Sequence, residues 1–224
     1  MSERKPSFGD DLSTVIAIVT TEHFALQGTQ ASITSEAVGR ASMYLTTLSM
    51  AMVALSFAGQ ATHYQGDFLV FSTVTLVALF FLGLVTFERT LQISIDDHQA
   101  ARRANRIRQL YLELAPGLSR YLAPPAADNE ISTILYAAGI KSNQTQLLLT
   151  IAGMVSVVNS IVAGVLVGAL AFHVTSRPSP LAVGLGVVTF TASVLIHQRV
   201  QLRKRLNATN PLALSDDLDE DQSI

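Results

Sequence analysis

The sequence contains no cysteine among its 224 residues. Without thiol groups the chain can form neither a disulfide framework nor a thiolate metal site. Charged residues are also scarce, because they make up 14% of the chain against 49% for hydrophobic residues. Soluble domains carry about 25% charged residues, so this composition predicts a membrane protein.

The sequence also lacks the motifs of common enzymes. It has no phosphate-binding Walker loop, no GxSxG nucleophile motif and no HExxH zinc motif. None of the five histidines forms a pair at metal-ligand spacing within an apolar segment. The run Asp96-Asp97-His98 offers oxygen and nitrogen ligands to a divalent cation, but a solvated turn or helix face is the simpler interpretation. We therefore expect no enzyme, no metal site and no cofactor.

The apolar residues are concentrated in four blocks that contain no Asp, Glu, Lys or Arg. An α-helix needs about 20 such residues to cross a hydrocarbon core of about 30 Å. We expect four membrane spans, at residues 41–58, 68–87, 147–172 and 181–196. The absence of charge inside them argues against a proton-coupled transporter, which places ionisable groups within the membrane.

The remaining segments are expected to be cytoplasmic. They comprise an N-terminal helical arm (1–40), a helical region (88–144) and a basic, then acidic tail (197–224). Lysines and arginines favour the cytoplasmic side of a membrane, and all of the 15 except Arg177 fall on one side of a four-span arrangement. This count places both termini in the cytoplasm, at the inner membrane of a cell.

Local signals predict where the helices begin and end. A carboxylate at Asp10 or Asp11 is suited to cap a helix that starts at Leu12, and a threonine at position 20 or 21 is suited to restart it. The Pro116-Gly117 and Pro124-Pro125 pairs should interrupt the basic helix that follows the second span, so this helix should end near them. Asp128 should then begin a short helix before the third span.

The expected spans carry small and polar residues, which form stripes at helical spacing in the first and third. The second span offers Ser72, Thr75, Gly83 and Thr86, and the fourth offers Gly186, Ser193 and His197. Such residues let helices pack closely in lipid, and in an oligomer they can also line a pore, because hydroxyls partly replace the water around an ion. Helix packing and pore lining are therefore both open. The residues are Ser42, Thr46, Ser49 and Ser56 in the first span, and Thr150, Gly153, Asn159, Ser160, Gly164 and Gly168 in the third.

Four arginines follow the second span, at positions Arg102, Arg103, Arg106 and Arg108. At helical spacing they spread around much of the helix, as expected for residues that fix topology and keep the helix soluble. Basic residues near an anionic inner leaflet can also bind lipid head groups. The alternative is therefore a site for a head group, a nucleotide or an acidic partner.

The pattern TEHFALQGTQASITSEAVGRASMYLTTLSMAMVALSFAGQ, followed by a second span and then RRANRIRQLYLEL, resembles small multi-span membrane proteins of bacteria, chiefly actinobacteria, that have no assigned function. The resemblance covers nearly the whole chain. In architecture, two spans extended by cytoplasmic helices also resemble the SLATT group of membrane effectors. That likeness implies pore formation in nucleotide-activated bacterial defence, although the second pair of spans departs from the two-span pattern.

Together these features predict an all-α integral membrane four-helix bundle with cytoplasmic helical extensions. The leading hypothesis for its function is a homo-oligomeric pore or channel-like effector that the cytoplasmic helices gate. The alternative is a membrane anchor or accessory subunit that holds a cytoplasmic protein. The expected partners are the lipid bilayer, further copies of the chain, and a cytoplasmic protein or anionic lipid, with no nucleic acid.

Overall fold

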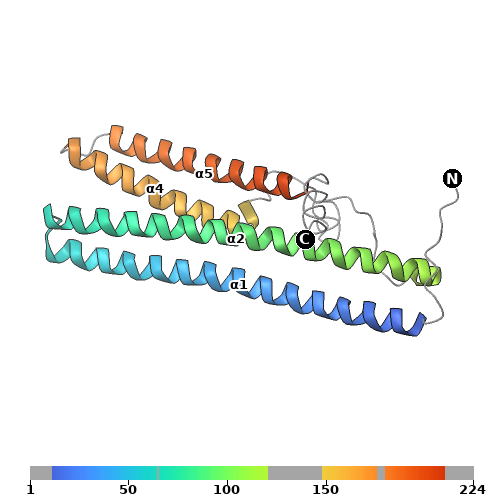
Figure 1. Ribbon diagram of the computed structural model, residues 1–224. Helices are drawn as coiled ribbons and strands as arrows, with labels where there is room; N and C mark the ends of the chain where they lie inside the picture. Colours follow the sequence, from blue (N-terminus) through green and yellow to red (C-terminus); the bar gives the residue numbers. More distant parts are fainter. Residues whose placement is uncertain (1–11, 65, 121–147, 176–179, 210–224) are drawn as a thin grey trace, which may run out of the picture. The chain divides into compact units, whose positions relative to one another are not determined.

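The computed structural model describes residues 12–64, 66–120, 148–175 and 180–209 of the chain. Throughout these ranges the regular structure is helical and no strand occurs. The long helices are labelled in Figure 1, and a short 3-10 helix follows α2. They are α1 (Leu12–Ala61), α2 (Gly66–Leu114), η1 (Pro116–Arg120), α4 (Ile151–Thr175) and α5 (Pro180–Thr209).

The four long helices account for the four apolar blocks of the sequence. Each of them is long and apolar enough to cross a membrane, which supports a membrane protein. The prediction of an all-helical fold is confirmed. The helices extend beyond the predicted spans: α1 runs from the N-terminal arm through residues 41–58, and α5 continues past residue 196 to Thr209.

The helix α1 is continuous from Leu12 through residues 20 and 21, so the expected restart there is wrong, and the cap expected at Asp10 or Asp11 lies outside the described residues. The Thr21 hydroxyl donates to the Ala17 carbonyl oxygen at 2.9 Å, one turn earlier in the same helix. A threonine can satisfy its hydroxyl in this way without interrupting the backbone, so it marks no boundary. The short helix expected at Asp128 lies outside the described residues.

The turn after α1 places two residues in the left-handed backbone region, with φ angles of 52° at His63 and 58° at Tyr64. The Tyr64 amide donates to the Gly59 carbonyl oxygen at 2.9 Å, which closes the helix end. The Tyr64 ring lies over Gly59, where a Cβ atom would overlap it. Its other contact is an edge-to-face packing on Phe68, with the ring centroids 5.2 Å apart.

The chain divides into two compact units, Met1–Ser35 with Asp96–Ile140, and Glu36–Ile95 with Lys141–Ile224. In the first unit, the start of α1 packs on the end of α2. The rings of His23 and Tyr111 meet at 6.2 Å, and Leu26, Ala100 and Ala104 are buried. This pairing explains why α2 remains helical well beyond its apolar block.

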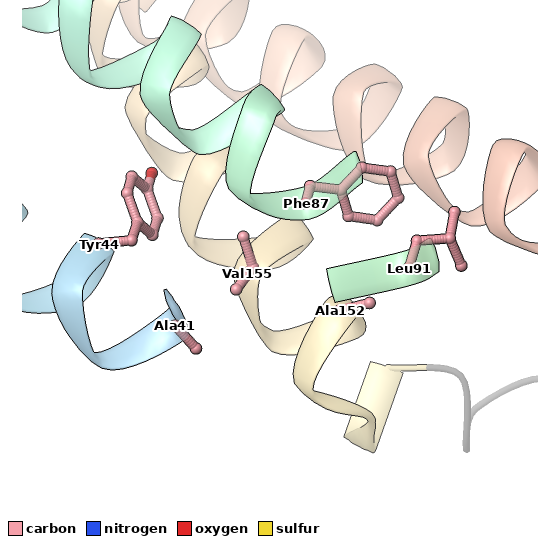
Figure 2. Packing of buried hydrophobic residues seen from close by; sticks show 6 residues of the cluster. All are labelled: Ala41, Tyr44, Phe87, Leu91, Ala152 and Val155. Carbon is pink, nitrogen blue, oxygen red and sulfur yellow. The ribbon is translucent and has the colours of Figure 1, made fainter. Parts of the chain in front are cut away.

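The core of the second unit draws on three helices, and Figure 2 shows its members. Phe87 closes the apolar block of α2, and Ala41 opens that of α1. The core therefore lies where the apolar blocks of α1 and α2 meet their charged extensions. Its members are Ala41 and Tyr44 of α1, Phe87 and Leu91 of α2, and Ala152 and Val155 of α4.

Candidate functional site: polar contacts between the helices

The polar residues of α4 are buried inside the second unit. Ser156, Asn159 and Ser160 each have a relative exposure of 0%. The Ser160 hydroxyl donates to the Ser156 carbonyl oxygen at 2.7 Å, and its Oγ lies 2.9 Å from Oγ of Ser193 on α5. Buried polar groups need such partners, because an unpaired one loses its hydration without compensation. These serines therefore join α4 to α5.

Asn159 joins α4 to α1. Its Oδ1 accepts a hydrogen bond from the Tyr44 hydroxyl at 3.3 Å. Gly83 of α2 makes room for this pair, since a Cβ atom there would overlap Asn159 Oδ1 and lie 2.7 Å from Tyr44 Oη. The Asn159 Nδ2 atom is buried without a partner among the described residues. Three helices thus meet around one side-chain amide.

The glycines of α4 allow α5 to approach closely. A Cβ atom on Gly164 would lie 2.8 Å from the Gly186 carbonyl oxygen, and one on Gly186 would lie 2.9 Å from that of Gly164. At Gly168 the corresponding contact, with the Ala182 carbonyl oxygen, is an ordinary 3.5 Å. The same glycines floor an open apolar groove of about 540 Å³ between α4 and α5.

Thr150 and Gly153 lie at the start of α4. The Thr150 Oγ1 atom accepts a hydrogen bond from the Gly153 amide at 3.0 Å, which is the geometry of a helix N-cap. The Gln201 side chain of α5 donates to the same oxygen at 3.0 Å. Thr150 therefore both caps α4 and ties it to α5.

The stripe on α1 lies in different surroundings. Ser42, Thr46, Ser49 and Ser56 are all exposed in the structure, whereas the α4 stripe is buried or half-buried. The Ser49 hydroxyl donates to the Leu45 carbonyl oxygen at 2.9 Å, so its oxygen can still accept a hydrogen bond. A single chain therefore does not bring the two stripes together.

Ion pairs connect the helices just beyond the apolar blocks. Glu36 of α1 accepts hydrogen bonds from Arg40 at 2.8 Å and from Arg89 of α2 at 3.1 Å. The hydrogen bond from Arg40, then that from Arg89, lowers the pKa of the Glu36 carboxyl. From the sequence, Arg40 and Arg89 contributed only to the prediction of membrane topology. Their common contact with Glu36 was not predicted.

A second set of polar contacts joins α2 to α5. Lys204 forms an ion pair with Glu88, and the Arg205 guanidinium donates to the Ser94 hydroxyl at 2.9 Å. In the same interface, next to the apolar block of α5, His197 is 6% exposed. It packs edge-to-face on Phe87 with ring centroids 4.6 Å apart. Its Nδ1 lies 2.8 Å from the Ser193 carbonyl oxygen. Charge counting could not foresee these partners, because they are far apart in the sequence.

The arginine set on α2 is not one site. Arg102 is half-buried, whereas Arg103, Arg106 and Arg108 are exposed.

The run Asp96-Asp97-His98 lies on the same helix. Burial raises the pKa of the Asp97 carboxyl more than His98 lowers it. Within the described ranges, no group of three His, Cys, Asp or Glu side chains is arranged to hold a metal ion.

Comparison of the chain with protein-family models, curated proteins and solved structures gives no match.

Proposed function

We propose that this chain forms an oligomeric pore in the inner cell membrane, with both termini cytoplasmic. The observation that carries the proposal is the outward exposure of the α1 stripe on an otherwise apolar helix face. Polar side chains within a membrane favour water or a neighbouring helix over lipid. The α4 stripe already packs inside the chain, whereas the α1 stripe is a polar surface that remains available to face a pathway or another subunit.

The chemistry of the stripe favours a cation as the conducted species. The Ser49 hydroxyl donates its hydrogen to the Leu45 carbonyl oxygen, which leaves its lone pairs available as acceptors. Rings of oxygen acceptors replace part of a cation's hydration shell. Repeated around a symmetry axis, Thr46 and Ser49 would supply such rings.

The extensions of α1 and α2 are the proposed gate. The helix α1 has 29 residues before its apolar block, and α2 has 27 residues after its block. The two extensions contact each other through His23 and Tyr111. Because each is continuous with a span, a change in their packing would move the α1 face that carries the stripe.

A membrane anchor for a cytoplasmic protein is the second candidate, and specific surface residues favour it. Ile18 and Phe24 on the α1 extension are 63% and 66% exposed, and Arg103 and Arg106 are exposed on α2. Along the sequence of α2, Arg103 comes 16 residues after Phe87, the last residue of the apolar block. A helix leaving the membrane steeply would thus present these arginines to an acidic protein rather than to head groups.

Ion flux into liposomes that contain the purified chain separates the two candidates. We expect cation flux, which Ser49→Leu should reduce at least about tenfold because a bulky apolar side chain replaces the oxygen. The matched control is Ala54→Leu, since Ala54 is also exposed but lies about 140° around α1 from Ser49. Silent liposomes together with a stoichiometric co-purifying protein would instead establish the anchor.

A further inference from the structure

Arg205 differs from the other basic residues at the contact between α2 and α5. Its guanidinium is partly buried, and burial lowers its pKa. Lys204, the preceding residue, has Glu88 as its counter-ion, but the partner of Arg205 is the neutral Ser94 hydroxyl. Across the described residues, no carboxylate lies within ion-pair distance of Arg205.

A partly buried guanidinium without a counter-ion is an unfavourable arrangement. It has five N–H donors, and a single hydroxyl oxygen satisfies only a fraction of them. A buried charge costs free energy unless an opposite charge or hydrogen bonds compensate it. The donors that Ser94 does not satisfy are therefore available to an anion, and the fork of an arginine matches the oxygens of a phosphate.

The surroundings of Arg205 indicate where such a phosphate would come from. Leu195, Leu202 and Leu206 of α5 are 52%, 37% and 55% exposed, and their spacing of seven and four places them on one helix face that continues from the apolar block toward Arg205. Ser94 lies about 10 Å along α2 beyond Phe87, the depth of a lipid head group once helix tilt is allowed. Acyl chains on this leucine face would bring a head group to Arg205.

We propose that Arg205 and Ser94 form a binding site for the phosphate of an anionic phospholipid at the cytoplasmic end of α2 and α5. Basic positions between membrane helices on the cytoplasmic side are suited to anionic head groups. This inference rests on the proposed topology, in which the end of α5 is cytoplasmic, but it does not depend on ion conduction. The site is separate from the arginines that follow the second span.

The test measures lipid binding by the purified full-length chain in nanodiscs of phosphatidylcholine, with or without phosphatidylglycerol. We expect phosphatidylglycerol to raise the melting temperature of the wild-type chain and to remain bound in native mass spectrometry. Arg205→Gln should weaken this binding about tenfold, because the lost hydrogen bonds are to a charged group. The control, Arg203→Gln, removes the same charge from an exposed position and should stay within about twofold of wild type.

Further arms keep the assignment falsifiable. Ser94→Ala keeps every charge and should still weaken binding, which supports the proposal even if Arg205→Gln does not fold. Equal losses in Arg205→Gln and Arg203→Gln would overturn it, as would equal stabilisation by inorganic phosphate. Residues 214–224 carry acidic side chains. If their deletion abolishes the difference between wild type and Arg205→Gln, the anion at Arg205 is the chain's own tail, which would overturn the lipid assignment. Ion flux that stays unchanged in Arg205→Gln liposomes while lipid binding falls would show that the lipid site and the pore stand or fall separately.

Discussion

Gly186 marks the closest backbone approach between α4 and α5. A Cβ atom there would lie 2.9 Å from the Gly164 carbonyl oxygen, and a backbone oxygen cannot rotate away as a side chain can. We expect Gly186→Ala to push the two helices apart and to lower the free energy of unfolding by about 1–3 kcal/mol. Thermal unfolding in detergent measures the change.

The same helix offers a matched control. A Cβ atom on Gly184 would have nothing within 4 Å, so Gly184→Ala should leave the packing intact. Alanine is the better helix former by about 1 kcal/mol, and this substitution should be neutral or stabilising. If both alanines have the same effect, the close approach at Gly186 does not hold α4 and α5 together.

Glu36 shows how a single carboxylate connects two helices, since it accepts from Arg40 on its own helix and from Arg89 on α2. Because these arginines lower its pKa below the ordinary value of 4.5, the carboxylate stabilises the folded state fully above that pH. The stabilisation should be lost as the pH falls from 4.5 through the lowered pKa.

We expect the difference in melting temperature between wild type and Glu36→Gln to shrink as the pH falls from 6 to about 3. Comparing the two proteins at each pH removes the contribution of the other acids. Glu22→Gln is the control, because Glu22 is exposed on the same helix, and its difference from wild type should not follow that course. A Glu36→Gln difference that stays constant with pH would show that the ion pairs do not stabilise the fold.

At the scale of the elements, hydrophobic blocks and helix-breaking residues in the sequence predicted the locations of the long helices and the end of α2. Most of each apolar block lies within a long helix, although α4 begins at Ile151 rather than at residue 147. The helix α2 ends at Leu114, just before Pro116-Gly117, the first of the two proline pairs near which it was expected to end. These features are local: burial in lipid and the missing amide of proline act within a few residues. The same local reasoning misread Thr21, whose hydroxyl bonds inside α1 rather than capping a new helix.

Partners across helices could not be predicted in the same way. The sequence grouped Ser49 with Ser160 as similar polar residues, but one is exposed on α1 and the other is buried against Ser193. Helical spacing predicts which residues share a helix face, but it does not predict which helix or solvent that face contacts. Arg205 likewise counted as one more cytoplasmic charge, but its partial burial and its contact with Ser94 distinguish it from Arg203.

At the scale of the whole molecule, the proposed pore requires several chains to place their α1 stripes around a water-filled path. Because the chain has no cysteine, a single introduced thiol is the only one present. Ser49→Cys places it on the stripe, and Ala54→Cys places it on another exposed part of the same helix. Only a thiol that contacts water ionises and reacts readily with a charged, membrane-impermeant reagent.

The most direct test of the pore is therefore the rate at which such a reagent modifies these two variants in sealed liposomes, read together with ion flux. The account predicts that Cys at position 49 reacts at least about tenfold faster than Cys at position 54, and that its modification blocks the flux. Equal reaction rates at the two positions, or flux that survives complete modification at position 49, would contradict it.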